Sequence, residues 1–118
     1  VVSRPPQLIL VTDDTAGRAL TIDDIVVGDA VEQQFAFDRP ARDAFAIVAN
    51  DRAPVHDDER FAHSKGFGGP IIQGFCVASR FSRLIGMYLP GEHAILQGVN
   101  LLSGNLRMKG KPFVSECA

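Results

Sequence analysis

The chain has 118 residues, and its 12 basic and 14 acidic residues give a formal net charge of -2. This length favours one domain. A hydrophobic content of 46% is typical of a globular protein and argues against a disordered one. Charges of both signs are interspersed along the chain, so no basic tract indicates a nucleic-acid partner.

The cysteines and the apolar runs bear on the compartment. Cys76 and Cys117 lie far apart, and no group of Cys and His residues has the spacing of a zinc site, so we expect no metal. This cysteine usage is typical of a reducing compartment, and we expect a cytoplasmic protein. The longest apolar runs, such as residues 8–11, are far shorter than the ~20 residues that span a bilayer, so we expect no membrane span.

The predicted elements begin with two short strands. Residues 8–11 form an apolar run, and residues 30–37 alternate apolar and polar side chains, as a half-buried strand does. Between them, Thr21 is a possible cap of one helical turn, and Gly28 with Asp29 marks a turn.

The middle of the chain is predicted to be helical. Residues 38–50 begin with Asp-Arg-Pro, which suits a helix start, and then repeat apolar residues at helical spacing. Residues 57–62 predict one or two helical turns. Residues 70–88 form the longest predicted helix, and apolar side chains cover most of its circumference, so we expect it to be buried nearly all round. Two further short strands are predicted over residues 94–102 and 106–114.

The predicted loop over residues 51–56 contains a possible acid–base pair. Asp51 and His56 flank a Pro-containing turn and could share one water molecule, because a carboxylate accepts a proton and an imidazole can return one. Asp51 would need burial to act as a base near neutral pH. The plainer interpretation is that Asp51 caps a turn and His56 is an exposed loop residue, and the spacing alone favours this second interpretation.

A Gly-Pro step precedes the longest predicted helix. Gly68, Gly69 and Pro70 would direct the first backbone N–H groups of that helix toward the same loop, and such groups lack partners and favour negative charge. They could stabilise an oxyanion that develops on a thioester carbonyl. A plain loop-to-helix junction would use the same residue types.

Several short motifs occur together along the chain. They are DIVVGD at 24–29, NDRAPVH at 50–56, GFGGPI at 66–71, ASRFSRLIG at 78–86 and KPFV at 111–114. Taken together over residues 20–116, they resemble the MaoC-like dehydratases, a family that includes the (R)-specific enoyl-CoA hydratases. The linked set is far more specific than any single motif, and it favours the catalytic interpretation of Asp51 and His56.

The resemblance implies an α+β hot-dog fold, in which an antiparallel sheet wraps a long central helix, usually in a homodimer. Residues 20–118 would form this domain, and residues 1–19 an N-terminal extension. The family fold continues into long strands after the KPFV segment, whereas this chain stops at Ala118. We therefore expect a domain that lacks its C-terminal strands, or a helix that another subunit covers, because large exposed apolar patches are rare on soluble monomers.

The resemblance also implies a reaction, the reversible hydration of a trans-2-enoyl thioester to an (R)-3-hydroxyacyl thioester. Asp51 and His56 would be catalytic and would activate or hold the water. Backbone N–H groups around Gly74 would polarise the thioester carbonyl. The substrate-binding residues would be Gly69, Gln73, Gly74 and Ser82. No metal or redox cofactor is implied, and coenzyme A or carrier-bound pantetheine enters as part of the substrate.

Ala53 and the short C-terminus depart from the family pattern and keep other functions open, whereas the departure at Gln73 bears on substrate preference. Ala53 stands where the family usually has Asn, and Gln73, which cannot titrate, stands where many members have His. One alternative is a thioesterase with the same fold, which the release of free thiol would favour. The other is a non-catalytic domain that binds acyl thioesters or assembles with other proteins, which affinity without turnover would favour.

Overall fold

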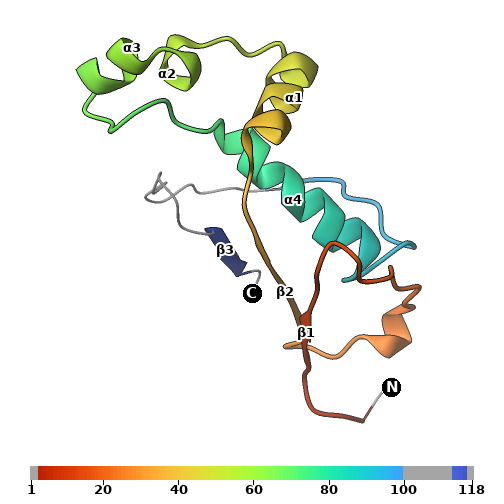
Figure 1. The fold of residues 1–118 in the computed structure, drawn as a ribbon. Helices are drawn as coiled ribbons and strands as arrows, with labels where there is room; N and C mark the ends of the chain where they lie inside the picture. Colours follow the sequence, from red (N-terminus) through yellow and green to blue (C-terminus); the bar gives the residue numbers. More distant parts are fainter. Residues whose placement is uncertain (1–2, 100–112, 117–118) are drawn as a thin grey trace. The chain divides into compact units, whose positions relative to one another are not determined.

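The computed structural model describes residues 3–99 and the backbone of residues 113–116 (Figure 1). Its elements are, in chain order, β1 (Leu8–Leu10), the short helix η1 (Ile22–Asp24), β2 (Ala30–Phe35), α1 (Arg39–Ala49), α2 (Pro54–Asp57), α3 (Glu59–Ser64), α4 (Gly74–Met87) and β3 (Phe113–Glu116). The fold class is therefore α+β, as the sequence predicts.

The described residues form two compact units. We name them the sheet unit, which contains residues 3–35, 80–99 and 113–116, and the helical unit, which contains residues 36–79. Helix α4 begins in the helical unit and ends in the sheet unit.

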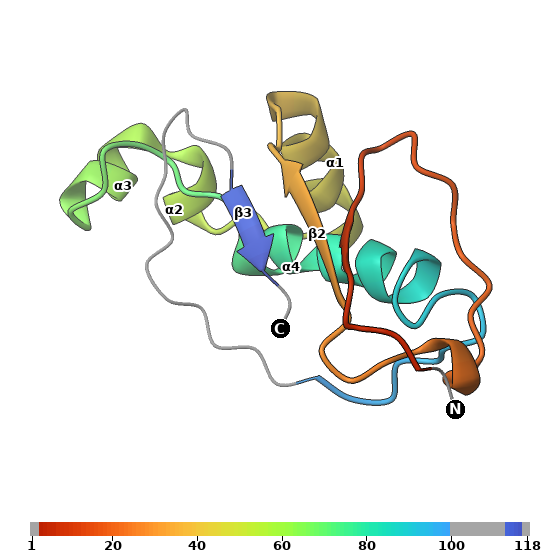
Figure 2. The ribbon, with the colours of Figure 1, turned by 90° about the horizontal axis from the view of Figure 1, so that it is seen from below.

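Strand β2 is the middle strand of a three-stranded sheet (Figure 2). It pairs in parallel with β1, with Ile9 opposite Val31, and antiparallel with β3, with Phe35 opposite Phe113. The expected antiparallel sheet around a long helix is therefore not confirmed for β1, which lies in the predicted N-terminal extension and pairs in parallel. The chain crosses over between β1 and β2 through residues 11–29, and a long crossover permits a parallel pair whereas a tight hairpin does not.

The predicted strands of the N-terminal part are confirmed in shortened form as β1 and β2. Residues 94–99 form no strand, so this part of the strand predicted over 94–102 is wrong. Ile95 is 86% exposed, so its side chain makes few of the packing contacts that would stabilise a strand at this position. Of the strand predicted over 106–114, only the last residues lie within the described part, and they begin β3.

The core of the sheet unit packs the end of α4 against the sheet. Leu84 and Tyr88 are fully buried, together with Val11 and Val31. Partly buried side chains pack around them, namely Ile9, Phe81 and Leu89. Burial of a side chain of this size stabilises the fold by ~1.5–3 kcal/mol, so these contacts hold β1 and β2 to the helix.

A partly buried polar network lies beside this core. Gln33 is 3% exposed; its Oε1 accepts from Arg83 at 2.8 Å, and its Nε2 donates to Asp13 at 2.8 Å. Arg83 also donates to the Tyr88 hydroxyl at 2.6 Å, and that hydroxyl donates to the Thr15 carbonyl at 2.6 Å. Because buried polar groups are costly without partners, these bonds join the loop after β1 specifically to α4.

An ion pair fixes the start of the chain to the turn before β2. Arg4 donates to both carboxylate oxygens of Asp29, at 2.8 and 2.6 Å, and the Asp29 side chain is only 4% exposed. The N–H groups of Gln7 and Val26 donate to the same carboxylate. The Arg4 hydrogen bonds, followed by the one from Val26, hold the pKa of Asp29 well below its ordinary value of 3.8.

We expect this carboxylate to make stability depend on acid pH. Its pKa is lowered in the folded state, so its contribution is complete above the ordinary carboxyl pKa and is lost as the pH falls toward the folded value. Between about pH 5 and pH 2, the urea midpoint should fall more steeply for the wild-type chain than for Asp29→Asn. An equally steep fall in Asp29→Asn would contradict this, with Asp14→Asn as the control at an exposed carboxylate.

Helix α1 begins and ends near the predicted residues. The Asp38 carboxylate accepts from the Ala41 N–H group at 2.9 Å and caps the helix, and Pro40 lies in the first turn. Asn50 ends the helix with a φ of 50°, in the left-handed region that Asn tolerates better than most residues. The core of the helical unit consists of Ile72, Cys76 and Val77, with Phe37 and Phe45 packed against them.

Helix α4 begins at Gly74, later than the proline at which the sequence predicts its start. The Ile71 N–H group donates to the Val55 carbonyl at 3.0 Å, and the Ile71 carbonyl accepts from His56. These tertiary contacts with α2 hold the segment before α4 out of the helix. The expectation that α4 is buried nearly all round is also wrong, because Phe75 is 77% exposed.

Candidate active site

Asp51 lies in the connection between α1 and α2, and His56 lies on α2 itself. The Asp51 N–H group donates to the Ala46 carbonyl at 3.2 Å, and the Asp51 carboxylate accepts from the Ala53 N–H group at 3.1 Å. This is the local turn that Asp side chains favour. Pro54 begins α2, so His56 lies on a short helix and not in a loop as predicted.

The hydrogen bonding of His56 defines its tautomer. Nδ1 lies 2.8 Å from the Ile71 carbonyl oxygen. A carbonyl oxygen can only accept, so Nδ1 carries a proton, and Nε2 is an acceptor when the ring is neutral. Protonation of Nε2 would give an imidazolium without disturbing the bond to Ile71. The ring is therefore held in a form that can take up and return a proton at Nε2.

Nε2 of His56 faces the Asp51 carboxylate. The distance from Nε2 to Oδ2 is 3.7 Å, which is too long for a direct hydrogen bond. Two acceptors at this separation suit one water molecule that donates a proton to each. The His56 side chain is 14% exposed and that of Asp51 is 37% exposed, so the described residues alone do not give Asp51 the burial that it would need as a base.

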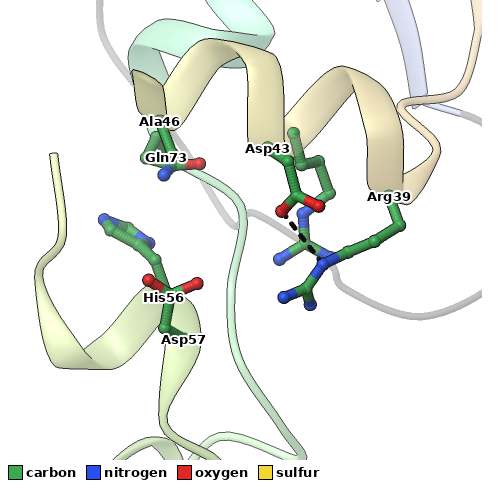
Figure 3. Close-up of a pocket in the computed structure, with 7 residues that line it drawn as sticks. Arg39, Asp43, Ala46, His56, Asp57 and Gln73 are labelled. Atoms are coloured by element: carbon green, nitrogen blue, oxygen red, sulfur yellow. Dashed lines mark ion pairs between the residues drawn. The ribbon is translucent and has the colours of Figure 1, made fainter. Parts of the chain in front are cut away.

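A pocket of about 210 Å³, open to solvent, lies beside His56 (Figure 3). Its lining residues come from α1, from α2 and from the segment before α4, and they are Arg39, Arg42, Asp43, Ala46, His56, Asp57 and Gln73. In Figure 3 the His56 ring and the Gln73 amide lie on one side of the pocket, and Arg39 lies on the other. Much of this volume is open solvent, so the pocket is a shallow hollow that would contact only one end of a substrate.

Gln73, predicted as a substrate-binding residue, is placed in this pocket with His56. It is 6% exposed, and its side-chain amide has no hydrogen-bond partner among residues 3–99. Its backbone carbonyl accepts from Cys76 at 3.0 Å and Val77 at 3.3 Å in the first turn of α4. Because buried amides are normally hydrogen-bonded, this side chain is available to a ligand or to water.

Of the predicted glycine positions, Gly74 begins α4 and Gly69 lies in the segment before it. The N–H groups of Gly74 and Phe75 have no hydrogen-bond partner within the part of the chain that the structure describes. A side chain added at Gly74 would meet no atom within 4 Å, and the same holds for Gly69, so the approach to this backbone is open. Ser82 lies on the portion of α4 that belongs to the sheet unit; it is exposed and is not among the residues that line the pocket.

Sequence reasoning missed the charged residues of α1. Arg42 and Asp43 follow Arg39 by three and four residues and precede Ala46 by four and three, and this helical spacing could have placed them on one face. Arg39 pairs with Asp43 at 3.0 Å. Arg42 is half-buried and forms no ion pair with any residue that the structure describes.

No group of three or more His, Cys, Asp or Glu side chains is placed to hold a metal ion, counting only the described ranges. Within the same ranges, every helix is too short or too polar to cross a bilayer.

Comparisons with known proteins give one family and two curated relatives. The MaoC-like domain family matches residues 26–101. The chain is 43% identical over 58 residues to the (R)-specific enoyl-CoA hydratase of Aeromonas caviae. This aligned segment covers 49% of this chain and 43% of that protein. The chain is 39% identical over 51 residues to the 3-hydroxybutyryl-CoA dehydratase of Methylorubrum extorquens. This second segment covers 43% of this chain and 32% of that protein.

The aligned segments cover only part of each relative. The chain spans less than half the length of these two proteins. No solved structure matches the chain.

Proposed function

Because the chain belongs to the MaoC-like domain family, we propose that it catalyses the reversible addition of water to a trans-2-enoyl thioester to give an (R)-3-hydroxyacyl thioester. The observation that carries the proposal is the placement of His56 Nε2 opposite Asp51 Oδ2 at 3.7 Å, with Nδ1 fixed on the Ile71 carbonyl. The two relatives are a hydratase and a dehydratase of CoA thioesters by name, and these activities are the two directions of one reaction.

The chemistry consists of proton transfers around one water molecule. Asp51 and His56 hold the water, and its oxygen attacks the β carbon of the enoyl group while one of the pair takes its proton. The protonated partner then delivers a proton to the α carbon, so that the elements of water add across the double bond. Dehydration follows the same steps in reverse, and either direction needs only these two side chains for proton transfer.

Negative charge develops on the thioester oxygen when the water attacks. The N–H groups of Gly74 and Phe75, at the positive end of α4, are suited to stabilise this charge. We assign Gly69 and Gly74 to the open backbone that the thioester approaches, and Ser82 to a further substrate contact. The proposed reaction uses no metal or redox cofactor, and coenzyme A or carrier pantetheine arrives as part of the substrate.

The test follows two products in one sample. The wild-type chain is mixed with crotonyl-CoA, and both the loss of conjugated enoyl absorbance and the release of free thiol are recorded. Loss of absorbance without thiol release, together with (R)-3-hydroxybutyryl-CoA in the product, supports the hydratase. Thiol release would instead identify a thioesterase, and crotonyl-CoA binding without either change would identify a non-catalytic binding domain.

We further propose that a second copy of the chain covers apolar side chains of the helical unit and completes a hot-dog fold. Phe75 on α4 is 77% exposed, and on α1 Ile47 is 68% and Val48 is 85% exposed. Large apolar side chains with such high exposure are typical of an interface when a partner covers them. A cytoplasmic location remains a proposal that rests on the cysteine usage.

Light scattering over a range of concentrations tests the homodimer. We expect a mass twice that of the chain, and a shift toward the monomer in Phe75→Ser. Val27→Ser, at an apolar residue that is 97% exposed in the sheet unit, is the matched control and should leave the mass unchanged. A folded monomer at every concentration would exclude the proposal.

A further inference from the structure

The pocket beside His56 contains donor groups that hydration itself does not use. We propose that Arg42 and Gln73 select an enoyl thioester whose acyl group carries a carboxylate on or next to the double bond. This inference rests on the proposed function, since it places the reacting double bond at His56. It names the class of substrate, which is the monothioester of an unsaturated dicarboxylic acid.

Arg42 supplies the positive charge. It lines the same pocket as His56, is half-buried, and has no ion-pair partner among the described residues. Arg39, one turn earlier on the same face, differs because its guanidinium is already paired with Asp43 and its side chain is 63% exposed. A partly desolvated guanidinium without an anion is costly, and a bound carboxylate would remove this cost.

Gln73 supplies the second donor. Its amide is buried in the pocket and is not hydrogen-bonded to any residue in the described part of the chain. An amide NH₂ group and a guanidinium are both donors, and together they match the two oxygens of a carboxylate. The two observations are independent, because Arg42 comes from α1 and Gln73 from the segment before α4.

The other charged groups around the pocket do not prevent an anion from binding at Arg42 and Gln73. The Asp43 carboxylate is occupied by Arg39 at 3.0 Å. Asp57 is exposed on α2, where water screens its charge. His56 is neutral or positive and does not repel an anion. The half-buried cation and the buried amide are therefore the groups that a bound anion would meet.

The coenzyme is a poorer source of the anion. Its phosphates are separated from the thioester by the whole pantetheine arm. A substrate whose double bond lies at His56 would therefore carry its phosphates well beyond Arg42, which lines the same small pocket as His56. A carboxylate on the acyl group lies within a few bonds of the reacting carbon and fits this position.

The test compares two acyl groups of equal length. The value of kcat/KM is measured for fumaryl-CoA, which carries the carboxylate, and for crotonyl-CoA, which carries a methyl group instead. We expect the wild-type chain to prefer fumaryl-CoA, and Arg42→Gln to reduce this preference by about 10- to 100-fold, as the loss of a charged hydrogen bond does. Arg42→Lys should retain part of the preference, and Gln73→Leu should reduce it.

The control variant and the contrary outcomes use the same ratio, that of kcat/KM for fumaryl-CoA to kcat/KM for crotonyl-CoA. Arg60→Gln, at an exposed arginine of α3, should leave the preference unchanged. An unchanged ratio in Arg42→Gln would overturn the inference. The pair is then repeated with N-acetylcysteamine thioesters, which have no phosphates; if the effect of Arg42→Gln vanishes there, the anion is a coenzyme phosphate and the inference is overturned.

A failure of the proposed function would be seen separately. If the wild-type chain hydrates neither thioester, calorimetric binding of succinyl-CoA and butyryl-CoA replaces turnover as the readout. Tighter binding of succinyl-CoA that Arg42→Gln abolishes would support the carboxylate subsite without catalysis. Equal binding of the two would refute the subsite as well.

Discussion

Replacing His56 by Gln is expected to lower kcat/KM for enoyl-thioester hydration by at least about 10²-fold. Gln can still donate a hydrogen bond toward the Ile71 carbonyl, which accepts from His56 Nδ1 at 2.8 Å. It cannot take up or release a proton near neutral pH. The variant therefore removes proton transfer while it keeps a polar group in the pocket. Steady-state rates with crotonyl-CoA measure the effect.

The matched control is His63→Gln. His63 lies on α3, is exposed, and is not among the residues that line the pocket. We expect its activity to stay within twofold of the wild-type chain. Activity of His56→Gln close to that of His63→Gln would show that the imidazole of His56 is not an acid or base in the reaction.

Tyr88→Ala is expected to destabilise the chain by about 3–5 kcal/mol, the cost of removing a large buried aromatic side chain. Tyr88 has no exposed surface and packs with Leu84 in the core of the sheet unit. Tyr88→Phe keeps the ring and removes the hydroxyl, which donates to the Thr15 carbonyl and accepts from Arg83. This smaller change should cost about 1–3 kcal/mol, because two partly buried polar groups lose a partner.

Urea unfolding followed by circular dichroism gives both values from one series. Val27→Ala, at a side chain that is 97% exposed, should change stability by less than about 0.5 kcal/mol and is the control. If Tyr88→Phe costs as little as Val27→Ala, the hydrogen bonds around Tyr88 do not contribute. If Tyr88→Ala is also mild, the packing of this core is not what holds the sheet unit together.

Local chemistry made some elements predictable. The Asp-Arg-Pro step gave the start of α1, because an Asp side chain caps free N–H groups and Pro suits the first turn. Alternating apolar side chains identified β2. The motif that pairs Asp51 with His56 also led to two side chains that the structure places 3.7 Å apart. All of these depend on residues close together in sequence.

Other features depend on contacts between distant residues and were missed or misplaced. The start of α4 moves to Gly74 because Ile71 bonds to α2, and the sequence around Pro70 carries no sign of that pairing. The parallel pairing of β1 with β2 depends on the path of residues 11–29. Arg42 belongs to the pocket only because α1, α2 and the segment before α4 meet there.

The central claim is that Asp51 and His56 act on the same water molecule, and a double-mutant cycle tests it most directly. Asp51→Asn, His56→Gln and the double variant are compared with the wild-type chain for hydration of crotonyl-CoA, with Asp14→Asn as the control for a surface carboxylate. Each single change should cost at least about 10²-fold, and the double variant should be little worse than the poorer single variant, because residues that act as a unit are not additive. Losses that multiply in the double variant, or full activity in either single variant, would contradict a shared water between Asp51 Oδ2 and His56 Nε2.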